Sequence, residues 1–328
     1  MVSAPFARVA VLGLGLVGGS LAQLLAQRGV VVVGQDVDAT AVTSARAVGL
    51  TATTSLAEAV EGADLVVLAV PLRAMRATAA ELARCIGTTA DATVTDVGSV
   101  KGPVRLAVEA AGLGDRFVGA HPMAGTEHSG FAASSAQLMD RAAWAVTVRP
   151  DDDGARLAPL LRLLTGPLAG TVAVLTDDVH DEAAALISHV PHVLATQLLN
   201  AVAGAPVRDA ALGLAAGSFR DGTRVAYTDP ARTEAMVTEN AAWVAPALRK
   251  AVRDLEALVA ALETNAPVHG FFRAADDVRA QGRPGERRAR GAQAPVPLDA
   301  GWPAALVARC ASGAVVTGLT ETEAVLAR

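Results

Sequence analysis

The first half of the chain alternates short runs of β-branched and aliphatic residues with alanine-rich stretches of helical spacing. Short apolar runs of this kind are typical of strands buried on both faces, and helical stretches between them are typical of the crossovers that join parallel strands. The pattern predicts a doubly wound α/β domain over residues 1–176. Its strands are expected at residues 8–12, 31–35, 64–70, 93–96, 117–120, 144–148 and 171–175.

From about Thr176 onward the apolar residues take helical spacing, and no further strand is predicted. One helix is expected to include residues 186–201 with a kink at Pro191, because proline cannot donate the backbone hydrogen bond of a helix interior. A second helix is expected over 244–262, and Asp229 and Pro230 suit the N-cap and first position of the helix before it. A helical domain over residues 177–265 follows from this pattern.

The last part of the chain, residues 266–328, has a less regular pattern. Residues 279–297 are rich in Arg, Gly and Pro without an apolar period, which predicts a mobile linker. Residues 302–319 are apolar, and we expect them to dock on the helical domain. The pattern assigns no other role to this C-terminal segment.

Charge and composition narrow the classes of partner. With 28 basic and 33 acidic residues the net charge is −5, so no global field draws the protein to nucleic acid or to an anionic membrane. The arginines of the linker lack the aromatic neighbours that single-strand binders use. Residues 9–27 are uncharged and long enough to resemble a membrane span, but four glycines argue against one. Cys85 and Cys310 lie far apart without metal-ligand spacing, which favours a reducing cytoplasm.

A glycine pattern directly follows the first predicted strand. Gly13, Gly15 and Gly18 form GxGxxG before a helix, and Asp36 ends the second strand 18 residues after Gly18. Such glycines let backbone amides approach a pyrophosphate, and the carboxylate can accept hydrogen bonds from both ribose hydroxyls. Because Asp36 would repel a 2′-phosphate, the pattern favours NAD over NADP. The alternative is a glycine turn that binds nothing.

Candidate catalytic residues follow the fourth and fifth predicted strands. Ser99 and His121 lie at the carboxyl ends of these strands, where open α/β sheets bind ligands. A histidine beside a hydroxyl suits removal of a proton from an alcohol as hydride leaves its carbon. The alternative places His121 in an ordinary turn before Pro122.

Five segments together resemble the prephenate/arogenate dehydrogenase family of tyrosine biosynthesis over residues 8–262. They are the glycine pattern, DVGSVK at 96–101, HPMAGTEHSG at 121–130, SHVPH at 188–192 and GSFRDGTR at 217–224. The resemblance implies a Rossmann domain followed by an all-helical dimerisation domain, hence a homodimer. It also implies that NAD takes a hydride from prephenate, which loses carbon dioxide and becomes 4-hydroxyphenylpyruvate.

The resemblance also implies roles for single residues. His121 matches the family histidine that hydrogen-bonds the ring hydroxyl of the substrate. Ser99 matches the family serine that orients this hydroxyl. The remaining matches concern the substrate: Arg224 holds a carboxylate, His189 and His192 lie near the cavity, and Glu127 and Asp221 help to close it. A metal site at His189 and His192 is not expected, because the zincin glutamate and spacing are missing and Pro191 intervenes.

Three other functions remain open at this point. Arogenate, which carries an amino group where prephenate has a keto oxygen, could be the substrate. Another two-domain dehydrogenase, for 3-hydroxyacids or imines, would explain the glycine pattern but not Ser99, His121 and Arg224 together. A non-catalytic NAD-binding sensor would bind NAD without turnover. Some relatives append a regulatory domain, but about 30 ordered residues at the C-terminus are too few for one.

Overall fold

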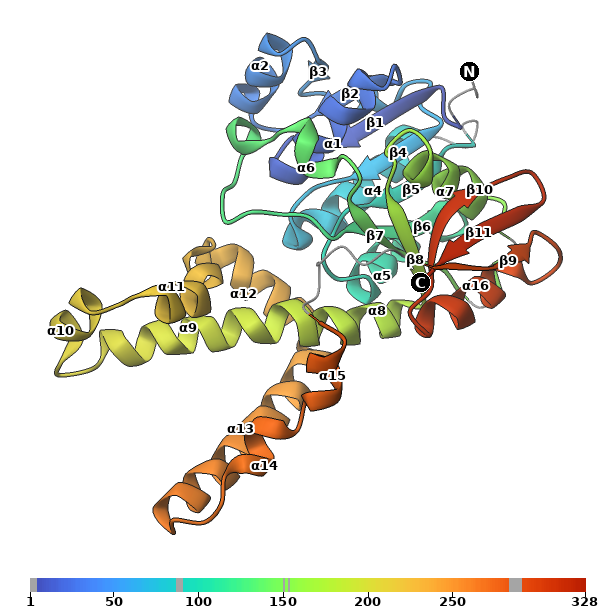
Figure 1. Ribbon diagram of the computed structural model, residues 1–328. Helices are drawn as coiled ribbons and strands as arrows, with labels where there is room; N and C mark the ends of the chain where they lie inside the picture. Colours follow the sequence, from blue (N-terminus) through green and yellow to red (C-terminus); the bar gives the residue numbers. More distant parts are fainter. Residues whose placement is uncertain (1–4, 87–90, 150, 153, 283–290) are drawn as a thin grey trace.

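A computed structural model describes residues 5–86, 91–149, 151–152, 154–282 and 291–328. Its strands form one mixed sheet in the order β3-β2-β1-β4-β5-β6-β7-β8-β10-β11-β9 (Figure 1). Neighbouring strands from β3 through β6 are parallel, β7 is antiparallel to β6, and β8 is parallel to β7. All seven predicted strands are present, and the three-residue β3 is an addition: β1 Arg8–Leu12, β2 Val31–Gln35, β3 Thr51–Thr53, β4 Leu65–Leu68, β5 Thr93–Asp96, β6 Phe117–Pro122, β7 Ala143–Thr147 and β8 Thr171–Leu175.

Helices cover both faces of this sheet, which confirms the Rossmann-type α/β class. Alternate residues of a strand point to opposite faces. Accordingly Val9 and Val11 of β1 lie in one hydrophobic core and Ala10 and Leu12 in the other, all four without exposed surface. Burial on both sides explains why β1 is apolar throughout. The helices are α1 Leu16–Gln27, α2 Ala39–Ala47, α3 Leu56–Val60, α4 Met75–Ile86, α5 Gly102–Ala110, α6 Ala136–Met139 and α7 Leu157–Thr165, with short 3-10 turns η1 Leu72–Ala74, η2 Gly114–Arg116 and η3 Phe131–Ala133.

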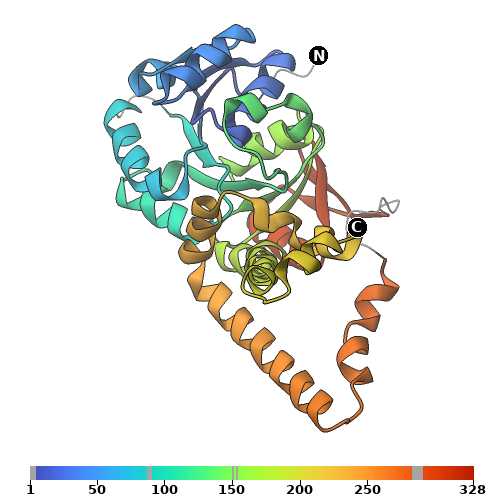
Figure 2. The same ribbon diagram turned by 90° about the vertical axis from the view of Figure 1, so that its left-hand side faces the viewer.

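The helical part of the chain begins with a long rod below the sheet, seen end-on in Figure 2. It consists of α8 Asp177–Ala184, a π-helical turn η4 Ala185–His189 and α9 Val190–Ala203. The sequence predicts a kink at Pro191; the structure has this π turn just before it, ending at His189, and Pro191 lies in the first turn of α9, where its missing N–H costs little. The other elements are α10 Arg208–Gly213, α11 Gly217–Thr223, η5 Arg224–Tyr227, α12 Pro230–Glu239, α13 Ala241–Glu263, α14 His269–Arg273 and α15 Asp276–Ala280.

Helix boundaries in this part follow local sequence signals. The Asp229 side chain accepts a hydrogen bond from the Ala231 N–H, and Pro230 is the first residue of α12, as predicted. Helix α13 projects away from the sheet, and α14 and α15 return toward it (Figure 2). None of the helices in the described ranges is both long and apolar enough to cross a membrane.

The C-terminal segment extends the sheet, so two expectations are wrong. Strands do not stop at Thr176, and residues 302–319 dock on the Rossmann domain rather than on the helical one. Strand β10 pairs with β8 through Val316 and Val172, and Trp302 of α16 contributes to the core of the Rossmann domain. The C-terminal elements are β9 Ala292–Pro297, α16 Trp302–Ala311, β10 Val315–Leu319 and β11 Glu323–Ala327.

The physical reason is that β8 would otherwise end the sheet with an unpaired edge, and β10 supplies its partner. The Trp302 ring fills the space beside Gly154, where an added Cβ would come within 2.3 Å of it. The mobile linker predicted over residues 279–297 is only partly tested. Arg279 belongs to α15 and residues 292–297 form β9, so both ends of the predicted linker are ordered, whereas residues 283–290 lie outside the described residues.

Candidate active site

The turn between β1 and α1 has the geometry that close approach of a dinucleotide needs. Gly13 has φ +102°, and a Cβ there would lie 2.5 Å from the Ala69 carbonyl oxygen. A Cβ on Gly18 would lie 2.0 Å from the Gly13 oxygen, so both positions require glycine. A Cβ on Gly15, the N-cap of α1, would meet open space. That open approach at a helix N-terminus fits a pyrophosphate.

Asp36 lies at the end of β2 beside this turn. Its two carboxylate oxygens accept hydrogen bonds from the N–H groups of Leu14, at 2.7 Å, and Asp38, at 2.9 Å. Each oxygen has a second lone pair, so the oriented carboxylate can still accept from two hydroxyls. The residues at this end of the sheet therefore fit the adenosine half of NAD.

A chain of hydrogen bonds begins at His121, near the end of β6. His121 Nδ1 lies 2.9 Å from His180 Nε2, and His180 Nδ1 lies 2.7 Å from the Asp181 carboxylate. Both His180 and Asp181 are buried at the middle of α8. The chain thus connects the Rossmann sheet with the first helix of the helical domain.

Asp181 sets the direction of this chain. Its carboxylate also accepts from the backbone N–H groups of Lys101, at 2.7 Å, and Gly102, at 2.9 Å, at the N-terminus of α5. Burial raises the pKa of Asp181, but the hydrogen bonds from His180 and from these N–H groups together lower it by more. The pKa of Asp181 is therefore below its usual value. The carboxylate therefore accepts from the Nδ1–H group of His180, and when the His180 ring carries one proton its Nε2 accepts from His121. His121 then carries its proton on Nδ1 and a lone pair on Nε2.

His121 is held neutral. Burial lowers its pKa well below the usual 6.5, and the charges of His180, Lys101 and His189 lower it further. A neutral imidazole with a free Nε2 lone pair is a general base. The half-buried Ser99 follows β5 on the neighbouring loop, and no hydrogen bond joins it to His121 within the described structure.

A buried ion pair fixes the two loops relative to each other. The Lys101 ammonium donates to the Asp96 carboxylate and to the Ala120 oxygen, and neither ion has exposed side-chain surface. The same carboxylate accepts from the N–H groups of Gly98, at 2.8 Å, and Ala120, at 3.1 Å. Burial raises the pKa of Asp96 and lowers that of Lys101, while their mutual attraction opposes both shifts. The pair joins the Ser99 loop to the strand that carries His121.

His189 and His192 lie at the junction of the π turn and α9. His189 is completely buried, and its Nδ1 lies 3.0 Å from the Asn240 side-chain nitrogen. Burial lowers the pKa of His189 to about 4, although nearby Asp181 opposes the shift. His192 is half-buried and donates from Nδ1 to the Ser188 oxygen at 2.8 Å.

The charged residues of the predicted substrate site are exposed. Arg224 begins η5 and forms no ion pair with any described residue, whereas Glu234 of α12 pairs with Arg73 at 2.6 Å. Glu127 lies 3.8 Å from His128, and Asp221 is exposed on α11. Among the described residues, no hydrogen bond or ion pair joins Arg224, Glu127 or Asp221 to the histidines at positions 121, 180, 189 and 192.

Helix α12 nevertheless connects the helical part with the loop after β6. Arg232 donates to the Thr126 oxygen at 3.2 Å, next to Glu127. The Arg73 and Glu234 pair joins the same helix to η1, which follows β4. Two contacts therefore place the helical domain over the carboxyl ends of the parallel strands.

Sequence reasoning missed His180, Asp181 and Asn240 as part of this site. An adjacent histidine and aspartate in the middle of a helix could have been noticed, but their partners lie about 60 to 80 residues away in sequence. Asn240 carries no signal, since an asparagine between two helices reads as an ordinary cap. In the ranges that the structure describes, no group of three or more His, Cys, Asp or Glu side chains is arranged so that it could hold a metal ion.

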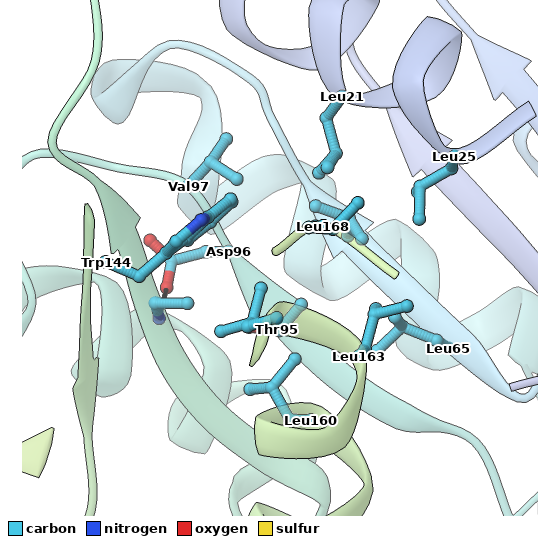
Figure 3. A pocket seen from close by; sticks show the side chains of 13 residues that line it. Leu21, Leu25, Leu65, Thr95, Asp96, Val97, Trp144, Leu160, Leu163 and Leu168 are labelled. Carbon is cyan, nitrogen blue, oxygen red and sulfur yellow. Dashed lines mark hydrogen bonds between the residues drawn. The ribbon is translucent and has the colours of Figure 1, made fainter. Parts of the chain in front are cut away.

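An internal cavity lies elsewhere in the Rossmann domain (Figure 3). Its volume is about 10 Å³, and its lining is mostly leucine and valine, with Trp144, Thr95 and Asp96 on one side. A space of this size holds about one water molecule and no substrate. It is a packing feature of the core, not the candidate active site.

Comparison with known proteins agrees with this geometry. The family model described as prephenate dehydrogenase, nucleotide-binding domain, matches residues 21–175, and the model described as prephenate dehydrogenase, dimerization domain, matches residues 176–273. Cyclohexadienyl dehydrogenase from Zymomonas mobilis is 34% identical over 78% of this chain and 89% of its own length. Prephenate dehydrogenase from Bacillus subtilis is 30% identical over 81% of this chain and 74% of its own length.

Solved structures give the same result. Prephenate dehydrogenase from A. aeolicus, in complex with hydroxyphenyl propionate and NAD+, superimposes with a TM-score of 0.75 at 31% identity and covers 84% of this chain and 96% of its own. A putative prephenate dehydrogenase from Corynebacterium glutamicum has a TM-score of 0.74 at 32% identity and covers 93% of this chain and 96% of its own. The resemblance stated from the sequence motifs is confirmed, and the chain belongs to the prephenate dehydrogenase family of NAD-dependent oxidoreductases.

Proposed function

We propose that the protein converts prephenate and NAD to 4-hydroxyphenylpyruvate, carbon dioxide and NADH, as a homodimer in the cytoplasm. The observation that carries this proposal is the hydrogen-bond chain from His121 through His180 to Asp181, from which we infer a neutral His121 with its lone pair on Nε2. The homodimer is supported by the family model that matches residues 176–273, which is described as a dimerization domain. The cytoplasmic location is supported by Cys85 and Cys310, which are free thiols.

His121 moves one proton during the reaction. NAD, when bound, accepts the hydride from the ring carbon that bears the hydroxyl group. As that hydride leaves, Nε2 of His121 takes the hydroxyl proton, and the hydrogen bond to His180 spreads the resulting charge toward Asp181. The carbon–carbon bond to the ring carboxylate breaks and its electron pair completes the aromatic ring. The proton then returns to the phenolate oxygen, so no proton is gained or lost overall.

Ser99 and Arg224 are proposed to position the substrate. Ser99 lies on the loop that the Lys101–Asp96 ion pair holds beside the strand of His121, so its hydroxyl can orient the substrate hydroxyl toward His121. Arg224 is exposed without an ionic partner among the described residues, which leaves its guanidinium free for the side-chain carboxylate. The ring carboxylate stays poorly paired, since tight pairing would oppose its departure as neutral carbon dioxide. His189, His192, Glu127 and Asp221 are proposed to complete the substrate cavity.

Arg224→Ala tests the binding role. Hydrogen bonds to charged groups contribute about 1.5–3 kcal/mol, so we expect KM for prephenate to rise about 10- to 100-fold while kcat changes little. Initial rates at saturating NAD measure both constants. Arg220→Ala is the matched control, because Arg220 is also exposed and lies one turn earlier. A large fall in kcat with unchanged KM would contradict the assignment.

Asp36→Asn tests the choice of cofactor. The amide keeps one acceptor but removes the negative charge, so we expect kcat/KM for NAD to fall about tenfold and the preference for NAD over NADP to shrink. Asp38→Asn is the control: Asp38 caps α2 by accepting from Thr40, and asparagine caps equally well. An unchanged cofactor preference in the Asp36 variant would show that another group selects NAD.

One assay decides between the candidate functions. The growth of NADH absorbance is followed with prephenate or arogenate, each offered with NAD or NADP. We expect turnover of prephenate with NAD. Preference for arogenate would keep the proton transfer at His121 and change the substrate. Absence of turnover in all four combinations, with NAD binding intact, would favour a non-catalytic sensor.

A further inference from the structure

Asn240 connects the two histidine systems of the site. It lies between α12 and α13, is 2% exposed, and its side-chain nitrogen is 2.8 Å from the Asp181 backbone oxygen and 3.0 Å from His189 Nδ1. Asp181 is the residue whose side chain ends the hydrogen-bond chain from His121. Asn240 therefore contacts both His189 and the residue that orients His121.

The orientation of the Asn240 amide follows from its partners. A backbone carbonyl oxygen can only accept, so the atom facing Asp181 must be the NH₂ group. One of its hydrogens points to that oxygen, and the other is available to His189 Nδ1. Nδ1 must then accept, which leaves the proton of neutral His189 on Nε2. A second proton on Nδ1 would face the amide hydrogen, so the contact disfavours the imidazolium form.

The Nε2–H of His189 has no partner among the described residues, although it is fully buried. An unpaired buried donor costs about 1–3 kcal/mol, so a ligand that supplies an acceptor there recovers this cost. His189 is also close enough to His121 for its charge to influence the pKa of His121. The unpaired donor therefore belongs to the same site as the proposed base.

We propose that Asn240 is a positioning residue that holds His189 as a hydrogen-bond donor at Nε2, directed at an acceptor oxygen of the bound ligands. That oxygen belongs either to the organic acid or to the carboxamide of the nicotinamide. His121 and His189 then carry opposite tautomers in one site, with His121 an acceptor at Nε2 and His189 a donor. The assignment of the ligands rests on the proposed function, whereas the tautomer of His189 does not.

Nitrogen-15 NMR of histidine-labelled protein tests the tautomer directly. In the ligand-free wild type we expect His189, identified by the resonances lost in His189→Gln, to be protonated at Nε2 and bare at Nδ1. A wild-type spectrum with the proton on Nδ1 would overturn the proposal without any Asn240 variant. In Asn240→Asp a carboxylate that only accepts replaces the amide that donates to His189. We therefore expect Nδ1 of His189 to become protonated in this variant. An unchanged tautomer in a folded Asn240→Asp protein would also overturn it.

Two additions to the same sample identify the acceptor. A shift of the His189 Nε2–H resonance on adding NAD alone assigns it to the carboxamide. A shift that appears only when 3-(4-hydroxyphenyl)propionate follows NAD assigns it to the organic acid. No shift in either case would refute the donor role. These spectra need no turnover, so a failed activity assay with a shifted resonance would contradict the proposed reaction and leave this inference standing.

Kinetics provide the functional readout. The rates are measured at alkaline pH, so that His189 of the variant carries only one proton. There we expect Asn240→Asp to lower kcat/KM about tenfold, because Nε2 of His189 no longer donates. Asn265→Asp is the matched control, since Asn265 is exposed beyond the end of α13 and the change in charge is the same. Equal kcat/KM in wild type and Asn240→Asp would contradict a positioning role.

Discussion

Replacement of His121 by asparagine is expected to lower kcat about 10²- to 10⁴-fold, the usual contribution of a positioned general base. Asparagine keeps a hydrogen-bonding group near the end of β6 but cannot take the hydroxyl proton at Nε2. Binding of NAD is expected to persist, because the glycine turn and Asp36 lie at other strand ends. Steady-state rates with prephenate, together with NAD titration, measure the two effects separately.

The pH profile adds a second readout. Protonation of His121 removes the base, so kcat/KM falls as pH decreases through the pKa of His121. Because burial and nearby charges hold that pKa well below 6.5, we expect the acidic limb below pH 6.5. The residual activity of His121→Asn should lack this limb. His269→Asn, an exposed histidine on α14, is the control and should match the wild type. A His121 variant with wild-type kcat would exclude it as the base.

Lys101→Met is expected to cause the largest loss of stability among these variants. Lys101 and Asp96 are both fully buried, and removing one partner leaves an uncompensated charge in the core. Breaking a buried ion pair in this way costs about 3–5 kcal/mol of unfolding free energy. Urea unfolding at fixed protein concentration measures the difference.

Two further variants define the cause. Asp96→Asn combined with Lys101→Met removes both charges, and we expect the pair of changes to cost less than the sum of the single changes. Lys250→Met is the matched control, since Lys250 and Asp254 form an exposed pair for which about 0–1 kcal/mol is expected. Equal losses at Lys101 and Lys250 would show that the buried pair does not stabilise the fold.

Local signals were sufficient to identify much of the Rossmann domain. Its parallel strands are buried on both faces, so each appears in the sequence as a continuous apolar run, and β1 and β2 have their predicted bounds. Gly13 needs its positive φ for the turn itself, and a Cβ on Gly18 would meet the oxygen of Gly13 five residues earlier, which keeps the GxGxxG pattern recognisable. The N-cap at Asp229 also depends only on neighbouring residues.

Tertiary structure alone decided the features that depend on distant partners. The chain from His121 through His180 to Asp181 and the contact of Asn240 with His189 join residues about 50 to 60 positions apart, so neither spacing nor periodicity could reveal them. The pairing of β10 with β8 joins residues still farther apart. The sequence by itself determined the strand pattern, the dinucleotide turn and the family motifs, because these arise from local contacts. Folding decided the tautomers and the docking of the C-terminal segment, because hydrogen-bond direction and edge pairing exist only once distant segments meet.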